Sequence, residues 1–235
     1  MNLLRLERKK TNIKPYCFAA AMIFVCLLGL TYIFAWIPSL GTADSNATAL
    51  FSNYKGISAI SGAIALMSFS ALASAMGYRY VIKEFSGTSA VLLFTYPIDR
   101  KKLVWAKIKL LTAFISAAVL LVSIGCFVIF AVTGQLFSLV DDTLPLTDYI
   151  LIIRNAFVLA CLTNGITLCA LRVGFIKKSN SVTVICAIVF SMLLVNLAAD
   201  INNSFKITLV LSVITLLAGL LLVCNMARKV ENMEI

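Results

Sequence analysis

Long apolar runs separated by short polar connections make up most of the chain. Each run has about the 20 residues that a helix needs to cross a bilayer at a rise of 1.5 Å per residue. The runs must be helical, because lipid offers no hydrogen-bond partner to an exposed backbone N–H or C=O. The pattern predicts an all-α polytopic membrane protein with one transmembrane domain over residues 1–235 and six spans, at about 16–38, 56–76, 108–132, 149–171, 182–199 and 207–226.

The last two runs are close to the lower length limit for a span. They are joined by a polar turn over residues 200–204, which suits a helical hairpin. A second interpretation, in which parts of these runs form re-entrant segments, stays open at this point.

Composition supports the bilayer as the solvent. Apolar residues make up 61% of the 235 positions and charged residues 13%, and the mean hydropathy is +1.01. Soluble domains are nearer half apolar and a quarter charged. The first run is longer than a signal-peptide core, and no small-residue cleavage site follows it. We therefore expect the first span to be retained.

The distribution of Lys and Arg predicts the orientation of the spans. A six-span arrangement places 17 of the 20 basic residues on one face, in the N-terminal segment, the two connections after spans two and four, and the tail. Lys55, Arg154 and Lys206 fall on the other side. We expect both termini in the cytoplasm. The net charge of +10 then attracts anionic inner-leaflet lipid, and it requires no nucleic-acid partner.

The sequence lacks the residues of most catalytic and metal sites. It has no histidine and no phosphate-binding G-x-x-x-x-G-K-[ST] loop. Its seven cysteines all fall in apolar runs without a C-x-x-C pair, which favours packing roles. No span carries paired acidic residues that could activate water, which argues against an intramembrane enzyme. The chain is expected to bind no cofactor or metal and to catalyse no reaction itself.

The connection over residues 77–107 is more than a linker. Its first half mixes charged and apolar residues, and Pro97 then ends whatever helix precedes it. Asp99 is expected to start a new helix that runs back into the membrane. Near the lipid headgroups this helix would carry the interface anchors Arg100, Lys101, Lys102, Trp105 and Lys107. The first half is either a docking element for another protein or an amphipathic segment on the membrane surface.

This connection resembles the first cytoplasmic loop of ABC-2 type transporter permeases. The residues that carry the resemblance are Lys83-Glu84-Phe85-Ser86-Gly87-Thr88, then, after seven residues, Tyr96-Pro97-Ile98-Asp99-Arg100-Lys101-Lys102, with Lys107 beyond. Asp99 stands where the family commonly has Ser, and both cap helix N-termini. The match covers about 30 residues in detail and the six-span layout of the chain, and it is closest to small permeases of bacterial antimicrobial-peptide export or immunity systems.

The resemblance implies a permease in the bacterial cell membrane that pairs with a separate ABC ATPase, which would hold ATP and Mg. A coupling helix around Lys83–Leu93 would sit in a cleft of that ATPase, and Asn2–Thr11 would form an interfacial helix. Two permease copies, identical or homologous, would enclose the pathway. The implied ATPase contacts are Lys83, Glu84, Phe85, Thr88, Val91 and Leu92.

The spans contain few polar residues, and packing, snorkelling or hydrogen bonding can explain each of them without a transport role. Small residues crowd span two and favour tight helix packing. The resemblance implies instead that spans two and five line a cavity, with Ser58, Ser61, Ser68, Ser191 and Asn196 as pathway candidates. Arg154 either snorkels to the interface or serves a pathway or Asp148-paired role. Asn155 and Asn164 are expected to bond between helices.

Two functions from different classes follow. The first is an ATP-driven exporter subunit whose cargo is an amphipathic peptide or another apolar compound. The second is a stand-alone immunity or binding protein that acts without ATP. The connection at 77–107 favours the first, because a passive binder needs no protruding apolar helix followed by a proline break.

Overall fold

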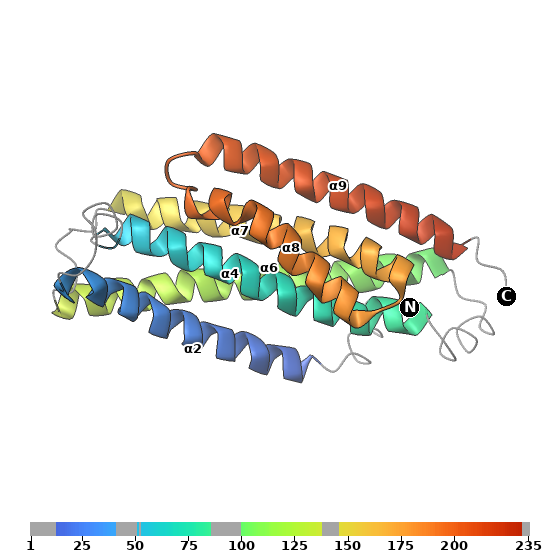
Figure 1. Cartoon of the computed structure of the whole chain (residues 1–235), viewed down its shortest axis with the longest axis horizontal. Helices are drawn as coiled ribbons and strands as arrows, with labels where there is room; N and C mark the ends of the chain where they lie inside the picture. Colours follow the sequence, from blue (N-terminus) through green and yellow to red (C-terminus); the bar gives the residue numbers. More distant parts are fainter. Residues whose placement is uncertain (1–12, 41–50, 52, 86–99, 138–145, 232–235) are drawn as a thin grey trace.

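The protein is a bundle of long helices in the computed structural model, which describes residues 13–40, 51, 53–85, 100–137 and 146–231 (Figure 1). Six helices within these ranges are long and apolar enough to cross a membrane, which confirms the predicted number of spans and fits a multi-pass membrane protein. The helices are α2 (Lys14–Trp36), α4 (Tyr54–Gly77), α6 (Arg100–Phe137), α7 (Leu146–Lys177), α8 (Asn180–Ala199) and α9 (Phe205–Glu231).

Short turns of other helical types extend two of the six helices. A 3-10 turn, η1 (Ile37–Leu40), follows α2. A π-helical turn, η2 (Tyr78–Ile82), and a 3-10 turn, η3 (Lys83–Phe85), continue α4. Helix α6 is longer than the predicted span, because its 38 residues join the segment after Arg100 to span three without a break.

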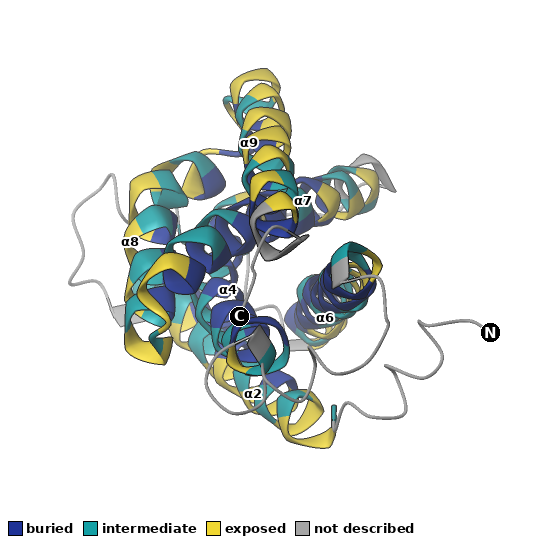
Figure 2. Cartoon of the chain, turned by 90° about the vertical axis from the view of Figure 1, so that its right-hand side faces the viewer, coloured by how far each residue is buried: buried dark blue, intermediate teal, exposed yellow. Residues whose placement is uncertain are grey.

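Helices α4 and α7 form the centre of the bundle, and the other four surround them (Figure 2). In α7, 72% of the most apolar stretch is buried within the chain, against 11% in α2 and 22% in α8 and in α9. The surrounding helices expose large apolar side chains, among them Phe18 and Trp36 of α2, Leu193 of α8 and Leu221 of α9. Such faces suit contact with lipid rather than with water.

Helices α8 and α9 are two separate helices, each long and apolar enough to cross a membrane. The turn between them is closed by the backbone N–H of Ser204, which donates to the carbonyl of Asp200 at 2.9 Å. Helix α8 packs on α4 and α7, whereas α9 packs on α7 and α6. The two helices therefore flank α7 and do not form the closely packed hairpin that the short turn suggested.

Glycines let α7 and α9 approach closely. A Cβ atom added to Gly165 would lie 2.9 Å from the backbone N of Leu216, and one added to Gly219 would lie 3.1 Å from the carbonyl oxygen of Gly165. Small residues at helix contacts bring backbones together and increase van der Waals packing where no hydrophobic effect drives association.

A chain of amide groups ties three elements together at one end of the bundle. The Nδ2 of Asn155 in α7 donates to Oδ1 of Asn202 at 2.7 Å, and Nδ2 of Asn202 donates to the carbonyl of Lys55 in α4 at 2.9 Å. Further along α7, Asn164 donates to Oγ of Ser116 in α6 at 2.7 Å. Asn164 therefore makes the interhelical bond predicted for it, whereas Asn155 bonds to the turn between α8 and α9.

Replacing Asn155 with alanine is expected to lower the free energy of unfolding by about 1–2 kcal/mol, because it removes the buried bond to Asn202. The measurement is equilibrium unfolding in mixed micelles, with Asn196→Ala as the matched control. Asn196 is exposed on α8. Equal losses in the two variants would contradict a stabilising role for the amide chain.

The two ends of the bundle differ in charge. The basic end is where α2 begins, η3 ends, α6 begins and α7 meets α8; the far end carries the other connections (Figure 1). The predicted interfacial helix over residues 2–11 lies outside the described residues, as does the predicted coupling helix beyond Phe85. Those two predictions stay predictions.

Candidate functional site

An ion pair between the buried Lys107 and the partly exposed Glu84 joins the stem of the 77–107 connection, residues 78–85, to α6 at the basic end. The Nζ of Lys107 lies 2.5 Å from Oε2 of Glu84, and it also donates to the carbonyl of Tyr80 at 3.2 Å. The side chain of Lys107 is 2% exposed and that of Glu84 is 25% exposed. In so little water a charged amine is stable only beside a countercharge and further acceptors, and both are present.

The π-helical turn η2 shapes the Glu84 side of this pair. In η2 the backbone N–H of Lys83 bonds back to the carbonyl of Tyr78, one residue further than in an α-helix. Such turns interrupt the regular ladder and occur often at functional positions. Val81 and Ile82 are buried, so the turn is packed into the bundle. The ring of Tyr80 lies 5.5 Å from that of Tyr16, which adds the start of α2 to the same contact.

Lys107, predicted as an anchor at the lipid headgroups, is buried and pairs with Glu84 instead. The difference arises because α6 begins by Arg100, so that Lys107 lies two turns inside the helix on the face packed toward the end of α4. A lysine on that face cannot reach headgroups while buried, and it takes the nearest carboxylate instead. The predicted ATPase contact of Glu84 stays a prediction.

The other predicted contacts and anchors are placed as follows. Lys83 is exposed at the stem, and Lys102 is exposed near the start of α6. Lys101 and Trp105 are half-buried, and Trp105 packs against the core. The side chains of Phe85 and Arg100, and the residues Thr88, Val91 and Leu92, lie outside the described part of the structure.

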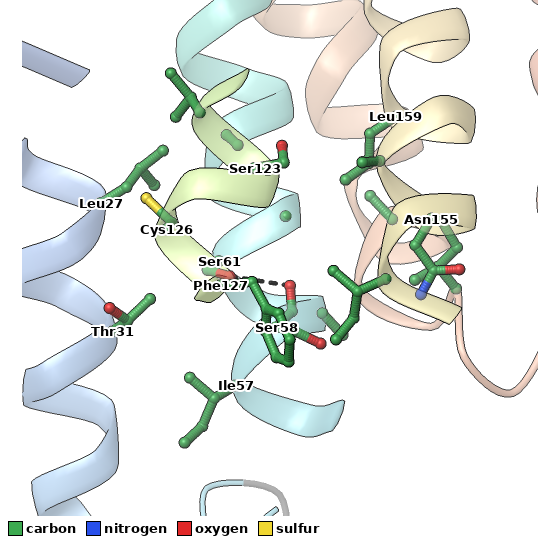
Figure 3. Close-up of a pocket in the computed structure, with 18 of the residues that line it drawn as sticks. Leu27, Thr31, Ile57, Ser58, Ser61, Ser123, Cys126, Phe127, Asn155 and Leu159 are labelled. Carbon is green, nitrogen blue, oxygen red and sulfur yellow. Dashed lines mark hydrogen bonds between the residues drawn. The ribbon is translucent and has the colours of Figure 1, made fainter. Parts of the chain in front are cut away.

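A small cavity lies in the far half of the bundle, between α2, α4, α6 and α7 (Figure 3). Its volume is about 40 Å³, room for a few water molecules. Two pathway candidates line it, and both bond to their own helix: Ser58 donates to the carbonyl of Lys55, and Ser61 donates to that of Ser58. The cavity is too small for a peptide.

One cavity residue was missed from the sequence. The Oγ of Ser123 in α6 is buried, lines the cavity and has no hydrogen-bond partner within the described residues. A single hydroxyl in an apolar run is its only sequence signal. The remaining pathway candidates lie elsewhere: Ser68 and Ser191 bond to their own helices, Ser191 being fully buried, and Asn196 is exposed on α8.

A larger groove opens on the side of the bundle between α6, α7 and α9, with a volume of about 370 Å³. Apolar side chains such as Phe157 and Leu220 line most of it. Its polar residues are Asn164, Ser116 and Thr112, and the Oγ of Ser116 donates to the carbonyl of Thr112 at 2.8 Å. This groove is mostly apolar, with a narrow polar strip in the middle of the spans.

The described residues bring no three His, Cys, Asp or Glu side chains together, so they offer no cluster for a metal ion. The charged side chains that join two predicted site segments are Glu84 and Lys107. What this pair can do chemically is hold two segments together, since both partners are charged and engaged with each other.

Comparison with known proteins finds one protein of similar sequence. The chain is 29% identical over 108 residues to a Bacillus subtilis (strain 168) protein named "Uncharacterized protein YcbO", and the match covers 46% of this chain and 45% of that protein. The chain thus spans less than half the length of that relative. No family model matches the chain, and no solved structure matches it.

Proposed function

We propose that the chain is the membrane-spanning permease subunit of an ATP-binding cassette exporter, with its basic end in the cytoplasm. The observation that carries the proposal is the ion pair between Glu84 and Lys107. Glu84 lies in η3, where the part of the connection that resembles a coupling loop begins. Its ion pair with Lys107 fastens η3 to α6. A segment pushed by an ATPase needs a rigid attachment of this kind.

The attachment gives a route for motion from one end of the bundle to the other. Force on the 86–99 segment acts on η3 and on the start of α6, which the ion pair holds together. Helix α6 then runs to the far half, where Val122, Ser123 and Cys126 line the small cavity. Rigid helices that shift as units are the usual means by which such transitions reach a distant site.

The size of the cavity favours two permease copies. About 40 Å³ cannot hold a peptide-sized cargo, so the pathway would form between two subunits, identical or homologous. The mostly apolar groove between α6, α7 and α9 suits an amphipathic peptide or another apolar compound. ATP and Mg would bind the partner ATPase, and the protein would reside in the bacterial cell membrane with both termini cytoplasmic.

The test is co-expression with an ABC ATPase encoded beside this chain, followed by co-purification. Lys83→Glu combined with Phe85→Asp reverses one charge and removes one apolar side chain at the stem without altering Glu84 or Lys107. We expect recovery of the ATPase with this variant to fall about tenfold.

The matched control is Lys177→Glu, at an exposed position of the same end, which should leave recovery unchanged. We also expect the purified chain alone to hydrolyse no ATP. Hydrolysis without a partner would contradict the division of labour. Failure of the wild type to recover the ATPase would favour the stand-alone binding protein, and equal recovery with all variants would contradict an ATPase contact at η3.

A further inference from the structure

Arg154 is a cation held in place at the far end, and no countercharge pairs with it within the described residues. Its guanidinium carbon lies 3.6 Å from the centroid of the Phe205 ring at the start of α9. Its Nη2 donates to Oδ1 of Asn155 at a long 3.4 Å, and its Nε is buried with no hydrogen-bond partner. Among the described residues, no carboxylate forms an ion pair with Arg154. The guanidinium of Arg154 is thus held in place, but no carboxylate in the part of the chain that the structure describes neutralises its charge.

Hydrogen bonds and a ring contact hold the surroundings of Arg154 together. The amide chain from Asn155 through Asn202 to the carbonyl of Lys55 fixes the turn before α9, and so places Phe205 under the guanidinium. A face-on aromatic contact attracts a cation while its N–H groups remain available at the edge of the plane. Asp200, the acid of that turn, accepts a bond from Nδ2 of Asn203 at 3.0 Å instead.

A second basic residue follows Phe205, the ring that Arg154 contacts. This residue, Lys206, lies in the first turn of α9 and is exposed, and within the described residues it forms no ion pair. The start of a helix adds a partial positive charge of its own. Two basic residues and a positive helix end at the start of α9 make the local potential positive, which favours an anion there.

The side chains around Arg154 indicate whether such an anion would come from the lipid or from the water. Ile150 and Phe157, one turn before and one turn after Arg154 on α7, are 68% and 57% exposed, and Ile207 of α9 is 63% exposed. Trp36, of a residue type that gathers at headgroup level, is exposed at the same end of the bundle. The cations therefore lie at the border of an apolar, lipid-facing surface.

We propose that Arg154 and Lys206 bind the phosphate of an anionic phospholipid at the far end, with Phe205 and Asn155 as positioning residues and the acyl chains against α7 and α9. Arginine binds phosphate oxygens through two parallel N–H bonds. A lipid supplies the phosphate together with chains that cover Ile150, Phe157 and Ile207. This site does not depend on an ATPase partner.

The experiment is native mass spectrometry of the purified protein titrated with phosphatidylglycerol, and with phosphatidylcholine as the zwitterionic comparison. Arg154→Gln is expected to weaken phosphatidylglycerol binding about tenfold, the loss of one charge-assisted contact. Phe205→Leu, which keeps an apolar side chain without a ring face, should weaken it less. Lys177→Gln, which removes one charge from the other end of α7, should leave it unchanged.

Two further arms keep the test decisive. Arg154→Lys retains the charge but loses the paired donors of the guanidinium, so it should bind more weakly than wild type and more tightly than Arg154→Gln. This variant covers the case in which Arg154→Gln fails to fold. Millimolar inorganic phosphate should not displace the lipid. Equal binding by wild type, Arg154→Gln and Phe205→Leu would overturn the site, and displacement by inorganic phosphate would overturn its assignment to lipid in favour of a soluble anion.

Discussion

Replacing Lys107 with methionine is expected to lower the free energy of unfolding by about 3 kcal/mol, the low end for breaking a buried ion pair. The variant fills the same volume but leaves the carboxylate of Glu84 facing a thioether instead of an ammonium group 2.5 Å away. The carbonyl of Tyr80 loses a donor at the same time. Trp105, two residues away and packed against the core, makes tryptophan fluorescence a suitable readout of unfolding in mixed micelles.

The double variant Glu84→Leu with Lys107→Met shows how much of the lost stability comes from leaving one charge of the pair without its partner. Replacing both partners by apolar residues is often close to neutral, so we expect the double variant to recover most of the stability lost in the single one. Lys109→Met is the matched control, because Lys109 is exposed on the same helix. A double variant as unstable as Lys107→Met would show that the ion pair is not the source of the effect.

Gly165→Val is expected to destabilise the protein by a similar amount, about 3 kcal/mol, the upper range for overpacking a core. A Cβ at this position would lie 2.9 Å from the backbone N of Leu216 and 2.9 Å from the backbone C of Thr215. Backbone atoms cannot turn aside as a flexible side chain does, so α9 would have to move away from α7.

Gly29→Val provides the matched comparison, since a Cβ at Gly29 meets nothing within 4 Å. We expect this change to stay within about 1 kcal/mol of wild type, near the difference in helix propensity. Unfolding in mixed micelles measures both variants. If Gly29→Val cost as much as Gly165→Val, helix propensity rather than the α7–α9 contact would account for the loss.

The two variants also bear differently on the proposed transport cycle. Breaking the ion pair would separate η3 from α6 and leave the rest of the bundle packed. Displacing α9 would instead open the groove that α9 forms with α6 and α7. An exporter is therefore expected to lose coupling between ATP hydrolysis and transport in the first variant, and to alter its lateral groove in the second.

The sequence by itself determined the six spans, and it did so for a simple reason. A helix in lipid needs a minimum apolar length, and residues such as Lys14 and Lys177 mark the ends of the runs. It also indicated that Asn164 bonds between helices, because a buried amide in an apolar span must find a partner; Asn155 finds its partner in the turn before α9.

Only the tertiary structure decided which faces of the spans meet. Lipid is as apolar as a helix interface, so hydrophobicity around a membrane helix does not mark its buried side as it does in water. This is why Ser58 and Ser61 line the cavity while Ser68, Ser191 and Asn196 do not. The contact of Lys107 with Glu84, and that of Arg154 with Phe205, likewise depend on how helices distant in sequence pack together.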